Sequence, residues 1–421
     1  MMEDKSNFQS ETLYNNNLVY KLPSASSVTI ARTLKRGLFQ NRSYTSGQTC
    51  TIQVNSGVDF VDTMNSALYM KVKTELATGA TGDYAVSFGN GSAMNLISRV
   101  RIYHRSGTCY TNSTLVNLYR CVEDHGKETT EWFNTVGKAM GYNMTGGYFT
   151  NIVADQNEAE FVIPLYKLHP MLESLNAGQM IPPQMMSGLR IEIDLAPANE
   201  AFTWAYNGES ANNPCDYSIT DIYLTLMSAT LTDDANSTLN IVAQKQTLEW
   251  VYNDVFTSVT STPSTTDTVN LDINRSVGYA THVTTSIRES RSVSSQEFDA
   301  FAIPYKSGSY WYLLGSLQFP INKIDKQSLA YHNFLVCFDK YKTATPGIVT
   351  PESFLLLNGA YVASLERDTS LALSSSIVNA SRALRLELTL DEPLDFQSLA
   401  TCFLTYTSSA RTSLLSSRVD V

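Results

Sequence analysis

A strict alternation of apolar and polar residues is the feature of this sequence that most constrains its fold. The segment SGLRIEIDL, residues 187–195, alternates without interruption. Because successive side chains of a β-strand point to opposite faces of a sheet, this pattern predicts a half-buried strand. Its buried face would carry Leu189, Ile191, Ile193 and Leu195, and its solvent face would carry Arg190, Glu192 and Asp194.

Nearly the same strand returns near the end of the sequence as RALRLELTL, residues 382–390. Alternation explains the repeated leucines, but it does not explain the shared arginine and glutamate. A second pair of strands, YLTLMSA from Tyr223 and FLTYTSSA from Phe403, follows in the same order. Ordered matches of this kind are typical of internal duplication, so we expect the two halves of the chain to be copies of one β-domain.

The composition agrees with an all-β protein. Charged residues make up 17% of the chain, against about 25% in typical soluble domains. The 23 Tyr and 17 Phe favour strands over helices. Two domains of about eight short strands each, joined by turn-rich loops, match two tandem jelly rolls, which are β-sandwiches built from two Greek keys.

Changes of pattern along the chain predict its organisation. Between Ser113 and Met140 apolar residues recur at a spacing of three to four, which indicates helix. Short strands continue through the second half, among them HNFLVCFDKY at 332–341. The expected division is a flexible N-terminal arm at 1–27, a first jelly roll at 28–235 with a helical insertion near 113–141, a linker at 236–265, and a second jelly roll at 266–421.

The balance of charge argues against a protein that coats nucleic acid. The chain has 30 basic and 40 acidic residues, a formal net charge of −10, whereas phosphate neutralisation requires clustered Lys and Arg. One basic cluster lies near the N-terminus, at Arg32, Lys35, Arg36 and Arg42. Two interpretations stay open for it: a solvated arm, or an inner-face contact with a genome or an acidic partner that gains strength from many copies.

Motifs for catalysis and for cofactors are not found in the sequence. The Gly-Lys pairs at 126–127 and 137–138 lack the Ser or Thr that follows in a phosphate-binding loop, and there is no G-x-S-x-G elbow. The five histidines do not occur at the spacings of metal ligands. We therefore expect no enzyme, no cofactor and no metal site.

Cysteine usage and hydropathy bear on localisation. Six scattered cysteines without a C-x-x-C predict buried free thiols in a protein made inside a cell. The N-terminal residues lack the apolar stretch of a signal peptide. No apolar run approaches the length of about 18 residues that a membrane span needs, so we expect no transmembrane segment.

Several longer strings, taken together, resemble the double jelly-roll major capsid proteins of polinton-like viruses and their relatives. In order, these strings are GSAMNLISRVRIYHRSGTCY, PLYKLHP with IPPQMMSGLRIEIDLA, YWYLLGSLQFPINKI, and ASLERDTS with VNASRALRLELTLDEP and FLTY. The resemblance extends over residues 45–421 and implies two jelly rolls side by side in one chain. Because the chain is short for this group, we expect modest loops.

The resemblance also implies a function. Chains of this family form homotrimers, which serve as pseudo-hexagonal capsomers of an icosahedral shell around double-stranded DNA. The protein would then be found in the virion, after assembly inside the host cell, together with penton and minor capsid or cement proteins. No specific nucleic-acid binding is expected, and residues 1–40 would lie on the inner face of the shell or bridge to a neighbour.

Two other functional classes remain as alternatives. A viral or cell-surface adhesive protein that binds carbohydrate would present an exposed aromatic platform and a secretion signal. A hydrolase on a jelly-roll scaffold would need a clustered histidine and carboxylate motif. The sequence favours neither of them over a structural tile.

Overall fold

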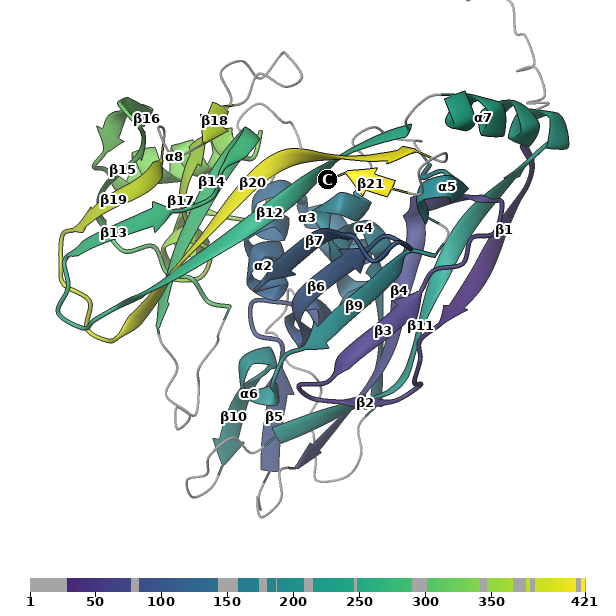
Figure 1. Ribbon diagram of the computed structural model, residues 1–421. Helices are drawn as coiled ribbons and strands as arrows, with labels where there is room; N and C mark the ends of the chain where they lie inside the picture. The colour runs from purple at the N-terminus through teal and green to yellow at the C-terminus, as the bar shows by residue number, and fades with distance from the viewer. Residues whose placement is uncertain are drawn as a thin grey trace, which may run out of the picture.

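The computed structural model folds the chain into two β-sandwich halves that lie side by side (Figure 1). The β-strands predominate, which confirms the prediction of an all-β protein with two jelly rolls. The structure describes residues 29–76, 83–142, 158–173, 180–186, 188–207, 215–245, 248–289, 301–340, 347–365, 376–378, 383–413 and 418–420. The predicted flexible arm at 1–27 lies outside the described residues.

The first half pairs two antiparallel sheets. One has the order β1-β11-β4-β8, with β2 paired to β11, and the other has the order β3-β9-β6-β7. A separate ribbon of β5 and β10 extends from one end (Figure 1). The strands are β1 (Thr29–Leu38), β2 (Tyr44–Thr45), β3 (Thr49–Gln53), β4 (Phe60–Leu76), β5 (Asp83–Ser87), β6 (Ile97–Tyr103), β7 (Cys109–Thr114), β8 (Glu158–Pro164), β9 (Arg190–Leu195), β10 (Thr203–Asn207) and β11 (Cys215–Leu231).

The second half repeats this arrangement. Its sheets have the orders β12-β20-β14-β17 and β13-β19-β15-β16, while β18 pairs with β14 and β21 pairs with β20. The strands are β12 (Leu248–Thr262), β13 (Thr268–Ile273), β14 (Val277–Glu289), β15 (Gly308–Leu314), β16 (Leu317–Ile324), β17 (Tyr361–Ser364), β18 (Ser376–Val378), β19 (Leu384–Leu390), β20 (Ser398–Ser413) and β21 (Arg418–Asp420).

The two repeated sequence strings occupy equivalent strands, which confirms the predicted duplication. Strand β9 lies second in its sheet, between β3 and β6, and β19 lies second in its sheet, between β13 and β15. Likewise, β11 lies between β1 and β4, and β20 lies between β12 and β14. The predicted leucine and isoleucine faces of β9 and β19 are buried to within a few per cent, as alternation requires. The two halves are therefore structural copies with one strand order.

Two hydrophobic clusters fill the sandwiches, one in each half. Each is built mainly from the inward faces of its two sheets, so strand residues alternate between core and surface, and helical residues add to both clusters. Two cysteines that lie in these clusters, Cys50 and Cys402, are buried free thiols, and burial raises the pKa of each to about 12. Cys109 is exposed, so the prediction that the cysteines are buried is wrong for this residue.

Two segments for which a linker or an arm was expected contain regular secondary structure. The proposed linker at 236–265 contains most of helix α7 (Asp233–Lys245) and all of β12, which pairs with β20 over its full length. Residues 29–38, part of the expected inner-face arm, form β1 and pair with β11. Both segments are rich in Ser, Thr or basic residues, but the ladder hydrogen bonds of a neighbouring strand satisfy their backbones.

The helical insertion near 113–141 is confirmed. It comprises α2 (Val116–Lys127), α3 (Thr130–Trp132) and the π-helical turn η2 (Phe133–Gly137). The strand predicted at 332–341 is wrong, because most of it belongs to helix α8 (Gln327–Cys337). No helix in the described ranges is long and apolar enough to cross a membrane. The remaining helical segments are η1 (Ala93–Leu96), α4 (Leu165–Leu168), η3 (Pro170–Leu172), α5 (Pro183–Met186), α6 (Ala198–Ala201) and α9 (Pro351–Leu356).

Candidate functional site

Helix α2 joins the two halves of the molecule. It follows β7 of the first half, yet Leu118, Tyr119 and Val122 belong to the hydrophobic cluster of the second half. At its C-terminal end the backbone of Gly126 lies so close to the second half that a Cβ there would be 2.5 Å from the ring of Phe338. A glycine is therefore required by packing rather than by backbone conformation, and α2 is a shared element of both sandwiches.

A buried ion-pair network anchors α2 to the first half. The ammonium of Lys167 lies 2.6 Å from a carboxylate oxygen of Asp124 and 2.6 Å from one of Glu128. The hydroxyl of Tyr142 donates to the other oxygen of Asp124 at 3.0 Å. Burial alone would lower the pKa of Lys167, but the two carboxylates outweigh it and raise the pKa. The ammonium and the carboxylates are therefore charged, and each of these buried groups has a hydrogen-bond partner within the network.

A second carboxylate on α2 connects the helix to the other half. Glu123 is almost fully buried and binds Lys127 of its own helix, while Nε2 of His282 on β14 lies 2.8 Å from its Oε1. Burial would raise the pKa of Glu123, but Lys127 and His282 hold it well below its usual range. One buried negative charge thus ties strand β14 to helix α2.

A third polar contact joins β7 to β12. Asp254 of β12 is buried and accepts hydrogen bonds from the hydroxyls of Thr111 (2.7 Å) and Tyr406 (2.8 Å). Burial raises the pKa of Asp254 despite these donors. Next to it, burial lowers the pKa of His169 to about 3, and the proximity of Arg120 contributes to the shift.

The hydrogen bonds of His169 fix its neutral tautomer. Its Nδ1 accepts from the backbone N–H of Met171 at 3.0 Å, so the ring proton is on Nε2. That nitrogen lies 2.8 Å from Oγ of Ser113 and 3.6 Å from Asp254. Because the imidazole is neutral, its approach to Asp254 is a dipolar contact within a buried network and contributes no ion pair.

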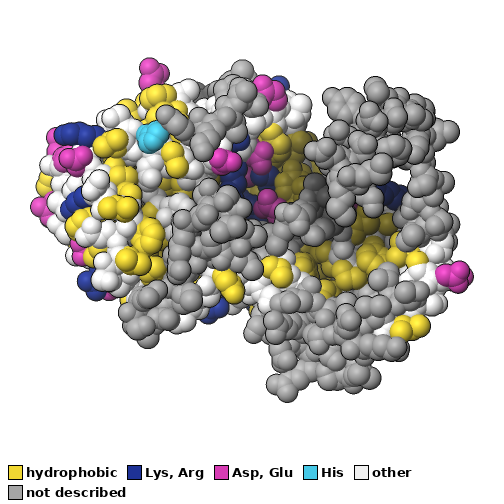
Figure 2. All heavy atoms as spheres, turned by 90° about the horizontal axis from the view of Figure 1, so that it is seen from above, with side chains coloured by type: hydrophobic (Ala, Val, Ile, Leu, Met, Phe, Trp, Pro, Cys, Tyr) yellow, Lys and Arg dark blue, Asp and Glu magenta, His cyan; other side chains and the backbone are white. Residues whose placement is uncertain are grey.

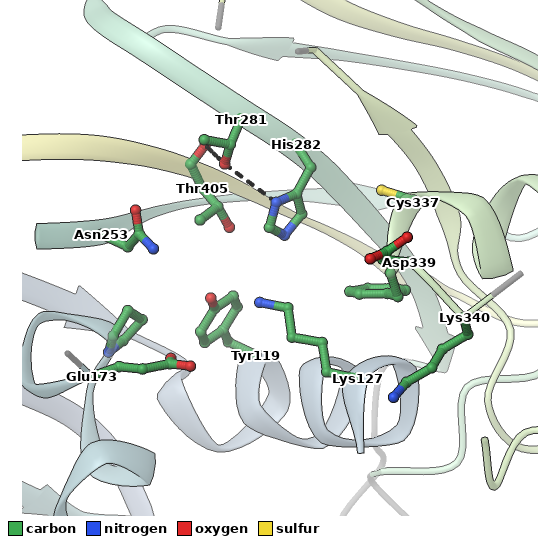
Figure 3. Close-up of a pocket in the computed structure, with 12 residues that line it drawn as sticks. Tyr119, Lys127, Glu173, Asn253, Thr281, His282, Cys337, Asp339, Lys340 and Thr405 are labelled. Carbon is green, nitrogen blue, oxygen red and sulfur yellow. Dashed lines mark hydrogen bonds between the residues drawn. The ribbon is translucent and has the colours of Figure 1, made fainter. Parts of the chain in front are cut away.

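A pocket of about 440 Å³ opens where these contacts meet. Figure 3 shows the side chain of Lys127 reaching from α2 into it, with His282 and Thr281 of β14 on the opposite wall. From above, charged side chains gather in the hollow between the two halves (Figure 2). The lining residues are Tyr119, Lys127, Pro170, Glu173, Asn253, Thr281, His282, Cys337, Phe338, Asp339, Lys340 and Thr405.

The residues around the pocket hold the two halves together, and we call the contacts of α2 with both halves, made through Glu123, Asp124, Lys167 and His282, the junction. Lys127 and His282 both contact the carboxylate of Glu123, so two basic residues that line the pocket already have a buried partner. Within the described ranges, no group of three or more metal-binding side chains comes together. The arrangement fixes the position of one sandwich against the other and leaves an opening between them.

The basic cluster predicted from the sequence lies elsewhere, on and after β1. Lys35 binds Asp59. Arg36 and Arg42 approach the two oxygens of Asp221 at 3.4 and 3.5 Å. Arg36 also lies over the ring of a tyrosine on β11, 3.5 Å from its centroid. Arg32, Lys35 and Arg36 thus belong to a sheet and Arg42 follows it. Three of the four residues make ion pairs with neighbouring segments, and the cluster is separate from the junction.

Sequence analysis did not identify the residues of the junction. Glu123 and His282 come from α2 and β14 and are 159 residues apart in the chain. The only local signal was the run of charged residues at 123–128, EDHGKE, within a helix that was also apolar. A helix with charge and apolar residues on several sides requires partners on several sides, but the sequence does not name them.

Comparison with known proteins identifies the fold. No protein-family model and no curated protein matches the chain. Among solved structures, it is similar to VP54 of PBCV-1 fitted into a reconstruction of the virophage Sputnik, with a TM-score of 0.62, 10% identity, and coverage of 95% of this chain and 98% of the other. It is also similar to the quasi-atomic model of the PBCV-1 virus capsid, with a TM-score of 0.62, 12% identity, and coverage of 95% of this chain and 98% of the other.

A third similar structure is the Faustovirus major capsid protein, with a TM-score of 0.60, 9% identity and coverage of 94% of both chains. At such low identity these likenesses show the fold alone. The double jelly-roll architecture that the sequence resemblance implied is therefore confirmed, over almost the whole chain.

Proposed function

We propose that this chain is the major capsid protein of an icosahedral double-stranded DNA virus and that it forms homotrimeric capsomers in the virion shell. The observation that carries the proposal is the double jelly roll itself: two sandwiches with one strand order fill nearly the whole chain. The similar structures are capsid proteins of PBCV-1 and Faustovirus. A tile needs closed cores and extensive side surfaces, and it needs no catalytic group.

The junction supports this role. Glu123, Asp124 and Lys167 fix the relative position of the two sandwiches through buried charges. A rigid orientation is what a tile needs in order to meet its neighbours at a constant angle. As part of the same proposal, the chain divides into its two rolls between β11 and β12, and penton and minor capsid proteins are further partners.

The basic cluster belongs to the proposal as a contact with a partner. Lys35, Arg36 and Arg42 are already engaged by carboxylates, and Arg36 is stacked on a ring. Binding to DNA depends on cations that are available to phosphates. The pairing of these three residues therefore favours a protein neighbour over the genome as their partner, and Arg32 on the same strand is proposed to contact the same neighbour.

The alternative of a carbohydrate-binding protein has less support. Tyr69 and Tyr223 form the aromatic pair on the outer surface of the first sheet, and their rings stack with centroids 4.5 Å apart. Arg36 lies over the ring of Tyr223. Because one face of each ring is turned to the other ring, and a guanidinium lies over Tyr223, the pair is not a fully open platform for a sugar.

The first experiment is to measure the mass of the purified protein by light scattering coupled to size exclusion. One chain has a mass of 46.6 kDa, so a trimer is expected at about 140 kDa. Electron microscopy of the concentrated protein then tests for shells or hexagonal arrays. A strict monomer at all concentrations and salt conditions, with no assemblies, would contradict the proposal and make a glycan-binding screen the next step.

A further inference from the structure

One sheet of the second roll is covered on its outer face by the first roll. Helix α2 of the first roll lies against this sheet (Figure 1), and the rings of Tyr119 on α2 and Phe403 on β20 are 5.5 Å apart. Further along the sheet, burial lowers the pKa of Arg288 on β14, and the nearby charge of Glu200 on α6 acts against this shift. The first roll therefore lies over the sheet at two separate points along β14 and β20.

The register of β14 and β20 shows which side chains face the first roll. Thr285 faces the core of its own sandwich, because its hydroxyl accepts a hydrogen bond from a tyrosine on β15 of the opposite sheet at 2.7 Å. Successive strand residues point to opposite faces, so Thr284 and Ser286 face the first roll. Ser286 lies directly opposite Thr401, and Thr284 lies opposite Phe403. Ser286 and Thr401 thus lie between the two points at which the first roll covers the sheet.

Three hydroxyls on this covered face are buried. Thr284, Ser286 and Thr401 are only 2%, 0% and 0% exposed. Among the residues that the structure describes, none supplies a hydrogen-bond partner to the side-chain oxygen of any of the three. We call these three residues the hydroxyl row. An unpaired buried hydroxyl is costly because it forgoes the hydrogen bonds that it makes with water in the unfolded chain, so three of them on one face require an explanation.

The surroundings of the hydroxyl row favour water as the partner. Leu118 and Val122 of α2 belong to the same hydrophobic cluster as Phe403, and their side chains have neither a donor nor an acceptor. The hydroxyl row is uncharged, so a buried ion would meet no opposite charge among its three side chains. The preceding pair of the two strands, His282 with Thr405, lines the pocket at the junction. The row therefore begins next to an opening from which water can enter.

We propose that the hydroxyl row is a binding site for ordered water between the two rolls, in which one water molecule bridges Ser286 and Thr401. Residues directly opposite on neighbouring strands have Cβ atoms about 5 Å apart, and a water molecule that makes two hydrogen bonds of about 2.8 Å spans such a gap. Thr284 lies on the longer diagonal from Thr401, where a second water extends the chain of hydrogen bonds. The inference concerns the packing of the two rolls within one chain, so it goes beyond the proposed function and does not depend on assembly.

Threonine-to-valine substitutions distinguish a hydrated row from a dry one, because valine replaces the hydroxyl by a methyl group of nearly the same volume. With water bound, Thr401→Val removes one of its partners, and the equilibrium constant of unfolding should rise about fivefold to tenfold. In a dry row the same change removes an unpaired polar group, so the constant should fall. Urea denaturation of the full chain, at one protein concentration, measures the constant.

Thr74→Val is the matched control. Thr74 of β4 is 2% exposed, and its hydroxyl also has no hydrogen-bond partner among the described residues. It alternates with the inward residues of β4, such as Met70 and Val72, so it faces the apolar core of the first roll. A single hydroxyl in an apolar core does not supply the two to four polar partners that a buried water needs. We therefore expect the unfolding constant of this variant to be unchanged or lower.

A double variant tests whether one water serves two hydroxyls. Ser286→Ala and Thr401→Val each break the same bridge, so the unfolding constant of the double variant should rise by clearly less than the product of the two single effects. A high-resolution crystal structure of the wild type should show a water within hydrogen-bond distance of both side-chain oxygens. Absence of that water, effects that multiply, or a Thr401→Val that stabilises as Thr74→Val does would each overturn the proposal. The mass of the protein in solution tests the proposed function separately.

Discussion

The two rolls share a strand order, but they bury different polar groups. In the first roll, His104, His125 and His169 are each at most 6% exposed. Both rolls bury tyrosines, but among the described residues of the second roll no histidine is buried, and its buried polar rings are tyrosines. Examples are Tyr312 and Tyr361, whose hydroxyls donate to backbone carbonyls at 2.8 and 2.7 Å. A buried histidine is an ionisable group near neutral pH, whereas burial raises the pKa of a tyrosine further above it.

The difference in buried ionisable groups follows from the contacts that the two rolls make. The strand order depends only on apolar inward faces, which both halves have. The first roll additionally supplies α2, with its buried charges, to the junction. Charged and titratable groups therefore concentrate in the first half, and the comparison predicts that this half is more sensitive to loss of a charge, to added volume on α2 and to acid.

The largest effect is expected from Lys167→Met. Loss of the ammonium leaves Asp124 and Glu128 without their shared partner, and an uncompensated buried charge costs about 3–5 kcal/mol. Urea denaturation measures the change in the free energy of unfolding. The control is Lys323→Met in the second roll, where the lysine lies over the ring of Trp311 and a change within about 0.5 kcal/mol is expected. Equal effects of the two substitutions would contradict the asymmetry.

The next effect is expected from Gly126→Ala. The new Cβ would lie 2.5–2.7 Å from three atoms of the Phe338 ring, and such overpacking typically costs about 1–3 kcal/mol. Alanine favours helix by about 1 kcal/mol over glycine, so a net loss identifies the clash. Gly278→Ala in β14, where a Cβ has open space, is the control and should be close to neutral. Phe338→Leu combined with Gly126→Ala should recover part of the loss.

The third effect is a loss of stability in acid that depends on His169. Its pKa is about 3 in the folded state, against about 6.5 in an unfolded chain. As the pH falls below about 6.5, this histidine binds a proton in the unfolded chain but stays neutral in the folded protein, so the free energy of unfolding decreases. Between pH 7 and pH 5 this histidine alone accounts for about 2 kcal/mol.

The measurement is the free energy of unfolding of the wild type and of His169→Gln at both pH values. The variant is expected to lose part of the pH dependence, whatever its stability at pH 7. Burial also lowers the pKa of His104 and His125, so a smaller dependence of the same sign should remain. Identical slopes for the two proteins would show that His169 does not control the acid response.

The sequence predicted the strands that carry strict alternation. β9 and β19 were assigned to equivalent positions from a few residues, because a strand with one buried and one solvent-exposed face alternates apolar and polar residues. The repeat also paired Tyr223 with Phe403, and the structure places both on the corresponding strands β11 and β20. Duplication was thus visible wherever two copies kept both their pattern and their order.

Other elements could not be predicted because their patterns are ambiguous. β12 ends in TSVTST, which has the composition of a loop, and only the pairing with β20 makes it a strand. The apolar run at 332–341 fits a buried strand or a buried helix equally well. The junction was out of reach for a different reason: Glu123 and His282 meet only after both sandwiches have formed.

The smallest expected effect compares the wet faces of the repeated strands. The Arg101–Asp194 pair beside β9 has an N–O distance of 2.6 Å and side chains 21% and 23% exposed. The Arg385–Asp272 pair of β19 has the same distance, but its side chains are 50% and 51% exposed. Partial burial strengthens a charged hydrogen bond, whereas solvent and salt screen an exposed one.

We therefore expect Asp194→Asn to lower the free energy of unfolding by about 1 kcal/mol, and Asp272→Asn to leave the melting temperature unchanged within error. Thermal unfolding at low and high salt separates the two, because the effect of Asp194→Asn should persist in salt. Asp194 also accepts a hydrogen bond from Thr49, so Thr49→Val measures that part separately. If Asp272→Asn destabilises as much as Asp194→Asn, the repeated strands are equivalent in energy as well as in position, and burial does not distinguish them.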